Sequence, residues 1–210
     1  MRRSVLIGVM VFFVATAAAQ DVTDRLLALM AGTYDTRAQG EGETRAGVKL
    51  PGRHEMRRVI YAPIAVPHIG PHVLFRQESK DGAITSRGLA VFEAATETGA
   101  VRMWLRQFVK PKEFSDLHLR ADAWPRVAID PAYGGKCPFH WRAAGDGFVG
   151  VLDGGRCEIV SNAGRAMAFE ARWELTGATL SIFDNTYDGA GALLAGRADR
   201  VPTRYDRLTQ

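Results

Sequence analysis

The sequence predicts an all-β protein: an antiparallel barrel of about ten strands with a short N-terminal helix. Three observations support this class. Apolar and polar residues alternate in short runs along most of the chain, Gly-containing turns separate these runs, and helical periodicity is confined to one segment near the N-terminus. A two-sheet sandwich fits the same pattern, but closure into a barrel is favoured because it removes exposed sheet edges.

The first twenty residues resemble a secretory signal peptide rather than part of the fold. Arg2 and Arg3 precede an apolar run at residues 5–14, which ends in the small residues Ala15, Ala17, Ala18 and Ala19. The run is too short to span a bilayer, although an uncleaved anchor is the alternative. We expect export to the periplasm or the medium, and a single domain over residues 21–210.

Composition excludes a nucleic-acid-binding class. The formal net charge is +4, two of these charges come from Arg2 and Arg3, and acids and bases are interleaved along the rest of the chain.

The short helix is predicted just after the signal peptide. Acidic residues at positions 21 and 24 precede the apolar Leu26, Leu27, Leu29 and Met30, and Gly32 ends the segment. A polar strand at residues 33–39 and a Gly-rich loop at residues 40–52 follow. The apolar side chains of such a helix would suit a plug at one end of a barrel.

Strands are predicted over the rest of the chain, interrupted once. The charged segment at residues 110–126, which contains Pro111 and Pro125, predicts a short helix or an irregular crossover. The predicted strands are residues 57–62, 73–78, 84–92, 101–109, 137–143, 148–152, 157–161, 167–175, 179–184 and 203–208.

Two cysteines, Cys137 and Cys157, flank a predicted hairpin. In an exported chain such a pair usually forms a disulfide, and a closed loop of about 20 residues would stabilise the fold by roughly 3 kcal/mol. A catalytic thiol is the alternative.

Several segments, taken in order, resemble the CpcT/CpeT-type chromophore lyases. LLALMAGTYDTRAQ resembles that family's opening helix and strand, VLFRQES its acidic strand, and ITSRGLAVFEA its Arg-containing partner. GGKCPFHWRAAGDGFVGVLDGGRCEIVS resembles its Gly-x-Cys, Trp, Phe-x-Gly, Cys progression. WELTGATLSIFDNTYDGAGALLAG resembles its closing Asp-x-x-x-Asp segment.

This resemblance implies a calycin-like barrel, often dimeric, that helps to attach bilins to protein cysteines. The expected ligand is an open-chain tetrapyrrole or a similar hydrophobic carboxylated molecule, with no separate cofactor, and an acceptor protein would be the partner. Export separates this chain from the family's usual acceptors, so enzyme activity is left open. The alternative is a non-catalytic periplasmic ligand-binding or envelope interaction protein.

Arginines on predicted strands are candidates to hold the ligand's carboxylates, because guanidinium groups bind carboxylates bidentately. Arg87 ranks first, since it matches the family's Arg-containing strand; an outward, solvated Arg87 is the alternative. The same reasoning names Arg57, Arg58 and Arg76.

A further set of candidate ligand contacts shares one face of a strand. Arg102, Trp104 and Arg106 alternate with apolar residues that we expect in the core. Their face is either a wet exterior or the wall of an amphipathic pocket. Tyr61, on the strand at residues 57–62, completes the expected ligand contacts.

Glu78 and Asp184 are the predicted catalytic carboxylates. The resemblance places Glu78 on the acidic strand, and Asp184 ends an apolar strand and opens the Asp-x-x-x-Asp segment with Asp188. A buried carboxyl has a raised pKa and can act as an acid. The alternatives for Asp184 are a turn cap and a calcium loop in DNTYDGAG. We expect no metal site, because the histidines are dispersed.

Overall fold

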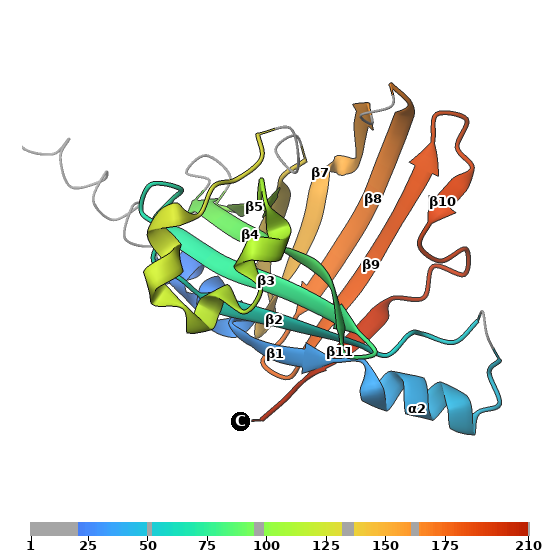
Figure 1. Ribbon diagram of the computed structural model, residues 1–210. Helices are drawn as coiled ribbons and strands as arrows, with labels where there is room; N and C mark the ends of the chain where they lie inside the picture. Colours follow the sequence, from blue (N-terminus) through green and yellow to red (C-terminus); the bar gives the residue numbers. More distant parts are fainter. Residues whose placement is uncertain (1–20, 50–51, 95–98, 132–136, 161–163, 210) are drawn as a thin grey trace, which may run out of the picture.

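The computed structural model describes residues 21–49, 52–94, 99–131, 137–160 and 164–209, so the predicted signal peptide lies outside the described residues (Figure 1). Within them the chain forms an antiparallel sheet of eleven strands. The strands are β1 (Gly32–Asp35), β2 (Arg57–Pro63), β3 (His72–Lys80), β4 (Ala83–Ala94), β5 (Val101–Gln107), β6 (Phe139–Ala144), β7 (Gly147–Val160), β8 (Ala166–Leu175), β9 (Thr179–Asp188), β10 (Leu193–Ala195) and β11 (Thr203–Arg207).

The sheet closes on itself. The strand order is β10-β9-β11-β1-β2-β3-β4-β5-β6-β7-β8, and β8 also pairs with β9 along nine residue pairs from Met167↔Asp188 to Leu175↔Leu180. Ten strands therefore form a closed barrel, and β10 is an extra strand on β9. This confirms the predicted barrel and excludes the sandwich.

Strand alternation separates the lumen from the outer face. On β8, the side chains of Ala171, Trp173 and Leu175 are buried in the barrel core, whereas Arg172 and Glu174 are exposed. The core also contains the large side chains Tyr34, Phe92, Met103, Phe139, Trp141 and Phe148. These aromatic and aliphatic groups fill much of the barrel interior.

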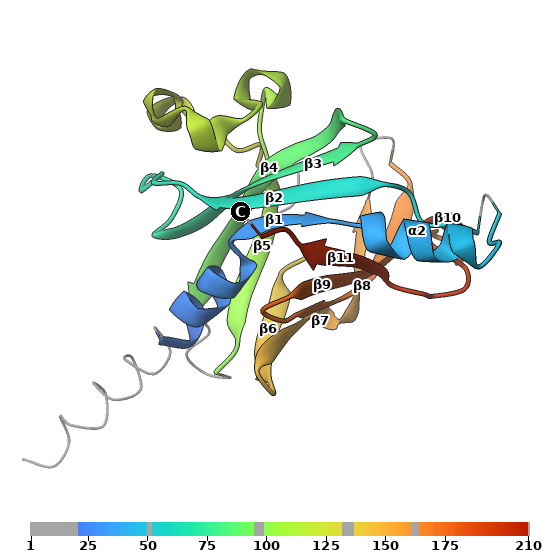
Figure 2. The same ribbon diagram turned by 90° about the horizontal axis from the view of Figure 1, so that it is seen from below.

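A helix covers one end of the barrel. Residues 21–30 are helical, and Leu26 and Met30 are fully buried against the barrel core. The Tyr34 hydroxyl donates a hydrogen bond to the Leu29 carbonyl oxygen at 2.8 Å and so ties the helix to β1. Figures 1 and 2 show this helix and α2 (Arg37–Arg45) at opposite ends of the molecule. The predicted N-terminal helix and its plug-like position are both present.

The irregular crossover between β5 and β6 packs on the outside of the sheet. It consists of three 3₁₀ turns, η1 (Pro111–Phe114), η2 (Leu117–Leu119) and η3 (Ala121–Arg126), and it lies over β3 and β4 (Figures 1 and 2). Phe114 and Leu117 form a second apolar cluster with Phe75 and Leu89, which point outward. β3 is therefore apolar on both faces. For this reason its sequence does not indicate which of its side chains point into the lumen.

Two strand predictions near the C-terminus were wrong in their limits. β7 is one strand from Gly147 to Val160, with a register shift between Val151 and Arg156, where the sequence predicts two strands. Gly154 and Gly155 have φ values of +64° and +75°, which glycine adopts readily, so the strand bends without ending. β9 continues to Asp188, so Asp184 does not end it.

The segment predicted as a strand and a loop contains α2 instead. This helix lacks an apolar stripe and contains Gly40 and Gly42, so its sequence does not indicate a helix. Tertiary contacts hold it. Gln39 accepts a hydrogen bond from the Arg204 backbone N–H at 2.7 Å, and Glu43 binds the imidazole and the backbone N–H of the buried His54.

The predicted disulfide is present between Cys137 and Cys157, whose Cα atoms are 5.8 Å apart. Both cysteines pack against the barrel core. None of the helices in the described residues combines the length and the apolar character needed to cross a membrane.

Gly150 provides a test of lumen packing. A Cβ at this position would lie 2.6 Å from the indole ring of Trp141, which is fully buried and has no room to move. We expect Gly150→Ala to lower the free energy of unfolding by about 1–3 kcal/mol in urea titrations.

Gly42→Ala is the matched control. A Cβ there would contact nothing within 4 Å, and alanine favours the helical backbone of α2, so stability should rise by about 0.5–1 kcal/mol. Equal effects of the two substitutions would contradict the close packing of Gly150 on Trp141.

Candidate functional site

The lumen contains a cluster of charged and phenolic side chains beside the apolar core. We call this set the lumen cluster, and its members come from β2, β3, β9 and β11. They are Arg57, Tyr61, Arg76, Glu78, Asp184 and Tyr205.

Strand register brings these residues together. Tyr61 is paired with Arg76, and Val59 with Glu78, while Leu74 of β3 lies in the barrel core. Because side chains alternate across a strand, Leu74, Arg76 and Glu78 all point into the lumen. On β9, Asp184 shares the lumen face of the core residue Ile182 by the same rule.

Glu78 lies between two arginines. Its Oε1 accepts a hydrogen bond from Arg57 Nη1 at 3.0 Å, and its Oε2 accepts one from Arg76 Nη2 at 2.6 Å. The hydroxyl of Tyr205 is 3.5 Å from Oε1. The Glu78 side chain is 10% exposed, so this carboxylate is buried and doubly paired.

Arg76 is fully engaged by groups of the protein. Besides Glu78, it donates from Nε to the Tyr61 hydroxyl at 3.3 Å and from Nη1 to the Ser86 hydroxyl at 3.2 Å. Each of its three nitrogens therefore has a partner. The network fixes the guanidinium in one orientation beside the buried Tyr61 ring.

The network continues from the lumen to the surface. Arg57 donates to Glu55 Oε2 from Nη2 at 2.6 Å, and the Glu55 carboxylate also binds Lys80 Nζ at 2.6 Å. Arg57 and Glu55 side chains are 43% and 40% exposed. Positive and negative charges therefore alternate along this series of contacting side chains, which runs through Lys80, Glu55, Arg57, Glu78 and Arg76.

The two predicted catalytic carboxylates have opposite pKa shifts. Burial alone would raise the pKa of Glu78, but the charges and hydrogen bonds of Arg76 and Arg57 hold it below its usual range. The lowered pKa favours an ionised Glu78 held by two guanidinium groups, whereas the sequence predicts a protonated acid at this position. The pKa of Asp184 is raised, chiefly by burial, although Arg57 and Arg76 oppose the shift.

Asp184 is open to solvent and yet surrounded by the barrel. Its side chain is exposed, so water reaches the carboxylate, while the neighbouring strands reduce its hydration enough to raise its pKa. Among the described residues, Arg57, Arg76 and Glu78 act on the pKa of this carboxyl through charge, without a contributing hydrogen bond. Asp184 is the member of the lumen cluster best placed to exchange a proton or accept a hydrogen bond.

Half-buried apolar groups lie beside the cluster on the lumen face. Leu105 of β5 and Phe169 of β8 pack against the core together with the Cys137–Cys157 disulfide. The lumen therefore combines a polar part and an apolar part, as a pocket for an amphipathic ligand requires.

Four predicted ligand contacts lie on the outer face instead. Arg87 is paired with Gln77, which points outward and binds Asp116 of the crossover. Arg102, Trp104 and Arg106 alternate with the core residues of β5, and Arg102 lies over the Trp104 ring at 5.2 Å.

The structure thus joins Glu78 and Asp184 with Tyr61, but Arg57 and Arg76 supply the cations where Arg87 was expected. Tyr205 was missed altogether. Arg57 and Arg76 were among the predicted candidates, and one signal could have ranked Arg76 above Arg87: Arg76 has the same parity as Glu78 along β3.

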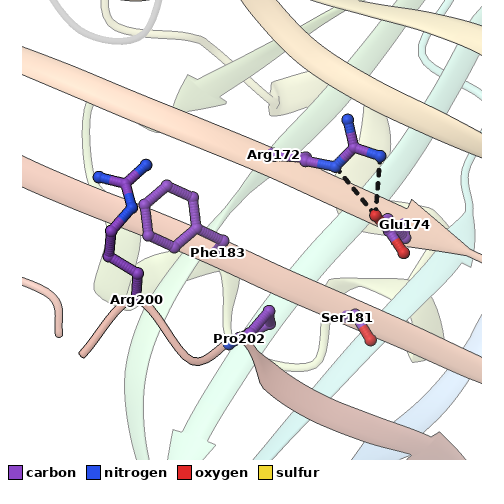
Figure 3. A pocket seen from close by; sticks show the side chains of 6 residues that line it. All are labelled: Arg172, Glu174, Ser181, Phe183, Arg200 and Pro202. Carbon is purple, nitrogen blue, oxygen red and sulfur yellow. Dashed lines mark hydrogen bonds and ion pairs between the residues drawn. The ribbon is translucent and has the colours of Figure 1, made fainter.

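A shallow groove of about 280 Å³ lies outside the barrel on β8 and β9 (Figure 3). Arg200 covers the ring of Phe183 at 4.6 Å, and Arg172 is paired with Glu174 at 2.9 Å. These charges are exposed and paired with acids. Within the described residues, no group of three or more His, Cys, Asp or Glu side chains could hold a metal ion.

Comparisons with known proteins give similarity at the level of structure. No protein-family model and no curated protein matches the sequence. The solved structure of the CRL protein of Arabidopsis superposes with a TM-score of 0.65 and 13% identity, over 92% of this chain and 99% of that chain. The T-type phycobiliprotein lyase CpeT from Prochlorococcus phage P-HM1 superposes with a TM-score of 0.52 and 10% identity, over 89% and 98%. At these identities the similarity shows a shared fold.

Removal of the Glu78 charge tests the central ion pairs. Glu78→Gln leaves the buried Arg76 guanidinium without its anion and leaves Glu55 as the acidic partner of Arg57, so the free energy of unfolding at pH 7 should fall by roughly 2–4 kcal/mol. Because the native pKa of Glu78 is lowered, its stabilising contribution is present above the unfolded pKa and is lost as the pH falls through the native pKa.

Urea titrations from pH 7 to pH 3 should therefore show the difference between wild type and variant shrinking on acidification. Glu174→Gln, which breaks an exposed pair on the outer face, should cost less than about 1 kcal/mol. A constant difference across this pH range would show that the Glu78 charge does not stabilise the fold.

Proposed function

We propose that this protein is a CpcT/CpeT-like barrel that binds a hydrophobic, carboxylated ligand of the open-chain tetrapyrrole class in its lumen. One observation carries the proposal: the lumen cluster lies beside half-buried apolar side chains inside a closed barrel. The barrel shared with CpeT, which is a phycobiliprotein lyase, supports the ligand class.

The finer proposal is that the protein assists attachment of this ligand to a cysteine of another protein. In such a reaction the acceptor thiol adds across an exocyclic double bond of the ligand, forming a C–S bond while a proton is delivered to carbon. Asp184 is the group assigned to proton transfer, because its pKa is raised and its carboxylate is accessible. Glu78 orients Arg76 and Arg57.

The chain's own cysteines do not act as the acceptor in this proposal, because they are joined to each other. The same disulfide is compatible with an oxidising, exported location, which we propose on the basis of the N-terminal sequence. The acceptor protein and a homodimeric state remain expectations from the resemblance.

A non-catalytic role is the second candidate. Trp141, Phe148 and Trp173 are buried in the barrel core, so protein side chains rather than a ligand occupy this part of the lumen. An exported barrel of this kind could bind a ligand, or contact other envelope proteins, without any reaction.

Titration with biliverdin and phycocyanobilin tests binding. Mature protein should shift the visible absorbance of the bilin, and Phe169→Ala should weaken binding by about tenfold, because it removes a half-buried ring from the lumen wall.

Arg87→Ala is the matched control on the outer face, and it should leave the affinity unchanged. No spectral change with wild type would contradict the binding proposal. A loss of binding in Arg87→Ala would indicate that the ligand binds on the outer face. A protein-linked bilin that resists denaturation, formed with an added phycobiliprotein subunit, distinguishes the lyase from the non-catalytic candidate.

A further inference from the structure

A buried histidine that is not part of the lumen cluster connects α2 with the C-terminal part of the chain. The His54 side chain is 2% exposed, and its imidazole Nδ1 contacts Glu43 Oε1. The backbone N–H of His54 donates to the other oxygen of the same carboxylate at 2.7 Å. On the other side of the ring, Nε2 faces the side-chain amide nitrogen of Gln39 at 3.5 Å.

The orientation of the Gln39 amide is fixed by backbone groups of the segment that enters β11, which lies beside α2 (Figure 2). Its Oε1 accepts a hydrogen bond from the Arg204 N–H at 2.7 Å, and its Nε2 donates to the Pro202 carbonyl oxygen at 3.2 Å. A backbone N–H only donates and a carbonyl oxygen only accepts, so a reversed amide would lose both bonds. The donor end of Gln39 is therefore the end that faces His54.

This geometry defines the protonation state of His54 in the structure. The amide N–H of Gln39 requires an accepting nitrogen at Nε2, and the carboxylate of Glu43 requires a donating one at Nδ1. The arrangement thus fits the neutral imidazole that carries its proton on Nδ1. Protonation would add an N–H at Nε2, directly opposite another donor and at a position that solvent hardly reaches.

The charged groups around His54 favour this second proton, whereas burial opposes it. Burial alone would raise the pKa of Glu43, but the hydrogen bonds and charge of His54 and the charge of Arg197 hold it below its usual range, so Glu43 is an anion. Asp199, in the segment before β11, also interacts with His54 through charge and is paired with Arg197. Histidine is the side chain that ordinarily changes charge between about pH 5 and pH 8.

Both segments that meet at Gln39 lead into the lumen cluster. On one side, His54 is followed by Glu55, which accepts a hydrogen bond from Arg57 at 2.6 Å. On the other side, Arg204 is followed by Tyr205, a member of the lumen cluster. A change in the partners of Gln39 therefore acts on backbone next to the polar part of the barrel.

We propose that His54 is a pH-sensitive switch that decides whether α2 is bonded to β11. In the neutral state, Gln39 binds the backbone at Pro202 and Arg204, as in the structure. In the protonated state, the Gln39 amide turns round, its oxygen accepts from His54 Nε2–H, and the Arg204 N–H loses its acceptor. Acidification thus strengthens the link between α2 and His54 and breaks the link between α2 and β11. The switch does not depend on the ligand proposed for the lumen.

Hydrogen exchange of the Arg204 amide, followed by NMR on the ¹⁵N-labelled mature protein, tests the switch. Between pH 8 and pH 5 the protection factor, which corrects for the intrinsic pH dependence of exchange, should fall by about tenfold, the effect of one lost hydrogen bond. The imidazole ¹⁵N shifts of His54 should show an unprotonated Nε2 at pH 8 and its protonation over the same range.

Two substitutions separate the switch from general effects of acid. His54→Asn keeps a donor for Glu43 but cannot titrate, so the protection of the Arg204 amide should stay high at both pH values. Gln39→Ala removes the acceptor, so protection should be low at both. His140→Asn, at another half-buried histidine on β6, is the matched control and should keep the wild-type response.

Unchanged protection of Arg204 between pH 8 and pH 5 in the wild type overturns the inference, as does a tenfold loss that persists in His54→Asn. If His54→Asn does not fold, Gln39→Ala decides the question: a wild-type pH response in that variant shows that the Gln39 amide is not the group that switches.

Discussion

The buried carboxylate of Glu78, held between Arg57 and Arg76, sets the character of the barrel interior. A charge inside a protein requires compensation, and here both oxygens accept hydrogen bonds from guanidinium groups on β2 and β3. Once Arg76 is committed to Glu78, its other nitrogens bind Tyr61 and Ser86. The ion pairs therefore fix the orientation of the side chains in the lumen cluster.

The barrel interior therefore has two parts, one apolar and closely packed and one polar. Towards the helix at residues 21–30, close packing of Trp141, Trp173 and Phe148 gives the fold its apolar core. Away from that helix, the barrel contains the polar network, of which Tyr61, Glu78 and Tyr205 are buried and Asp184 is exposed. The crossover buries the outer side of β3, so the same strand contributes to both apolar clusters and to the ion pairs.

Much of the fold could be predicted from the sequence because strand alternation and Gly-containing turns are local signals. β2, β3, β4, β5 and β8 lie where alternation predicts them. α2 and the continuous β7 could not be predicted, since their limits depend on contacts with β11 and on a glycine-rich bend within a sheet. The predicted site divides in the same way: Glu78, Asp184 and Tyr61 lie in the lumen, and Arg87, Arg102, Trp104 and Arg106 lie outside.

The sequence by itself determined the strand content, the buried face of β8 and the pairing of two cysteines, because each depends on residue type and spacing along one segment. Only the tertiary structure decided which arginines accompany Glu78. The inward and outward faces of β3 are both largely buried, so an apolar pattern along the strand does not indicate which side chains point into the lumen. Register with β2 and β4, and closure through β9, place Arg57, Arg76 and Asp184 around one lumen and Arg87 on the outer face.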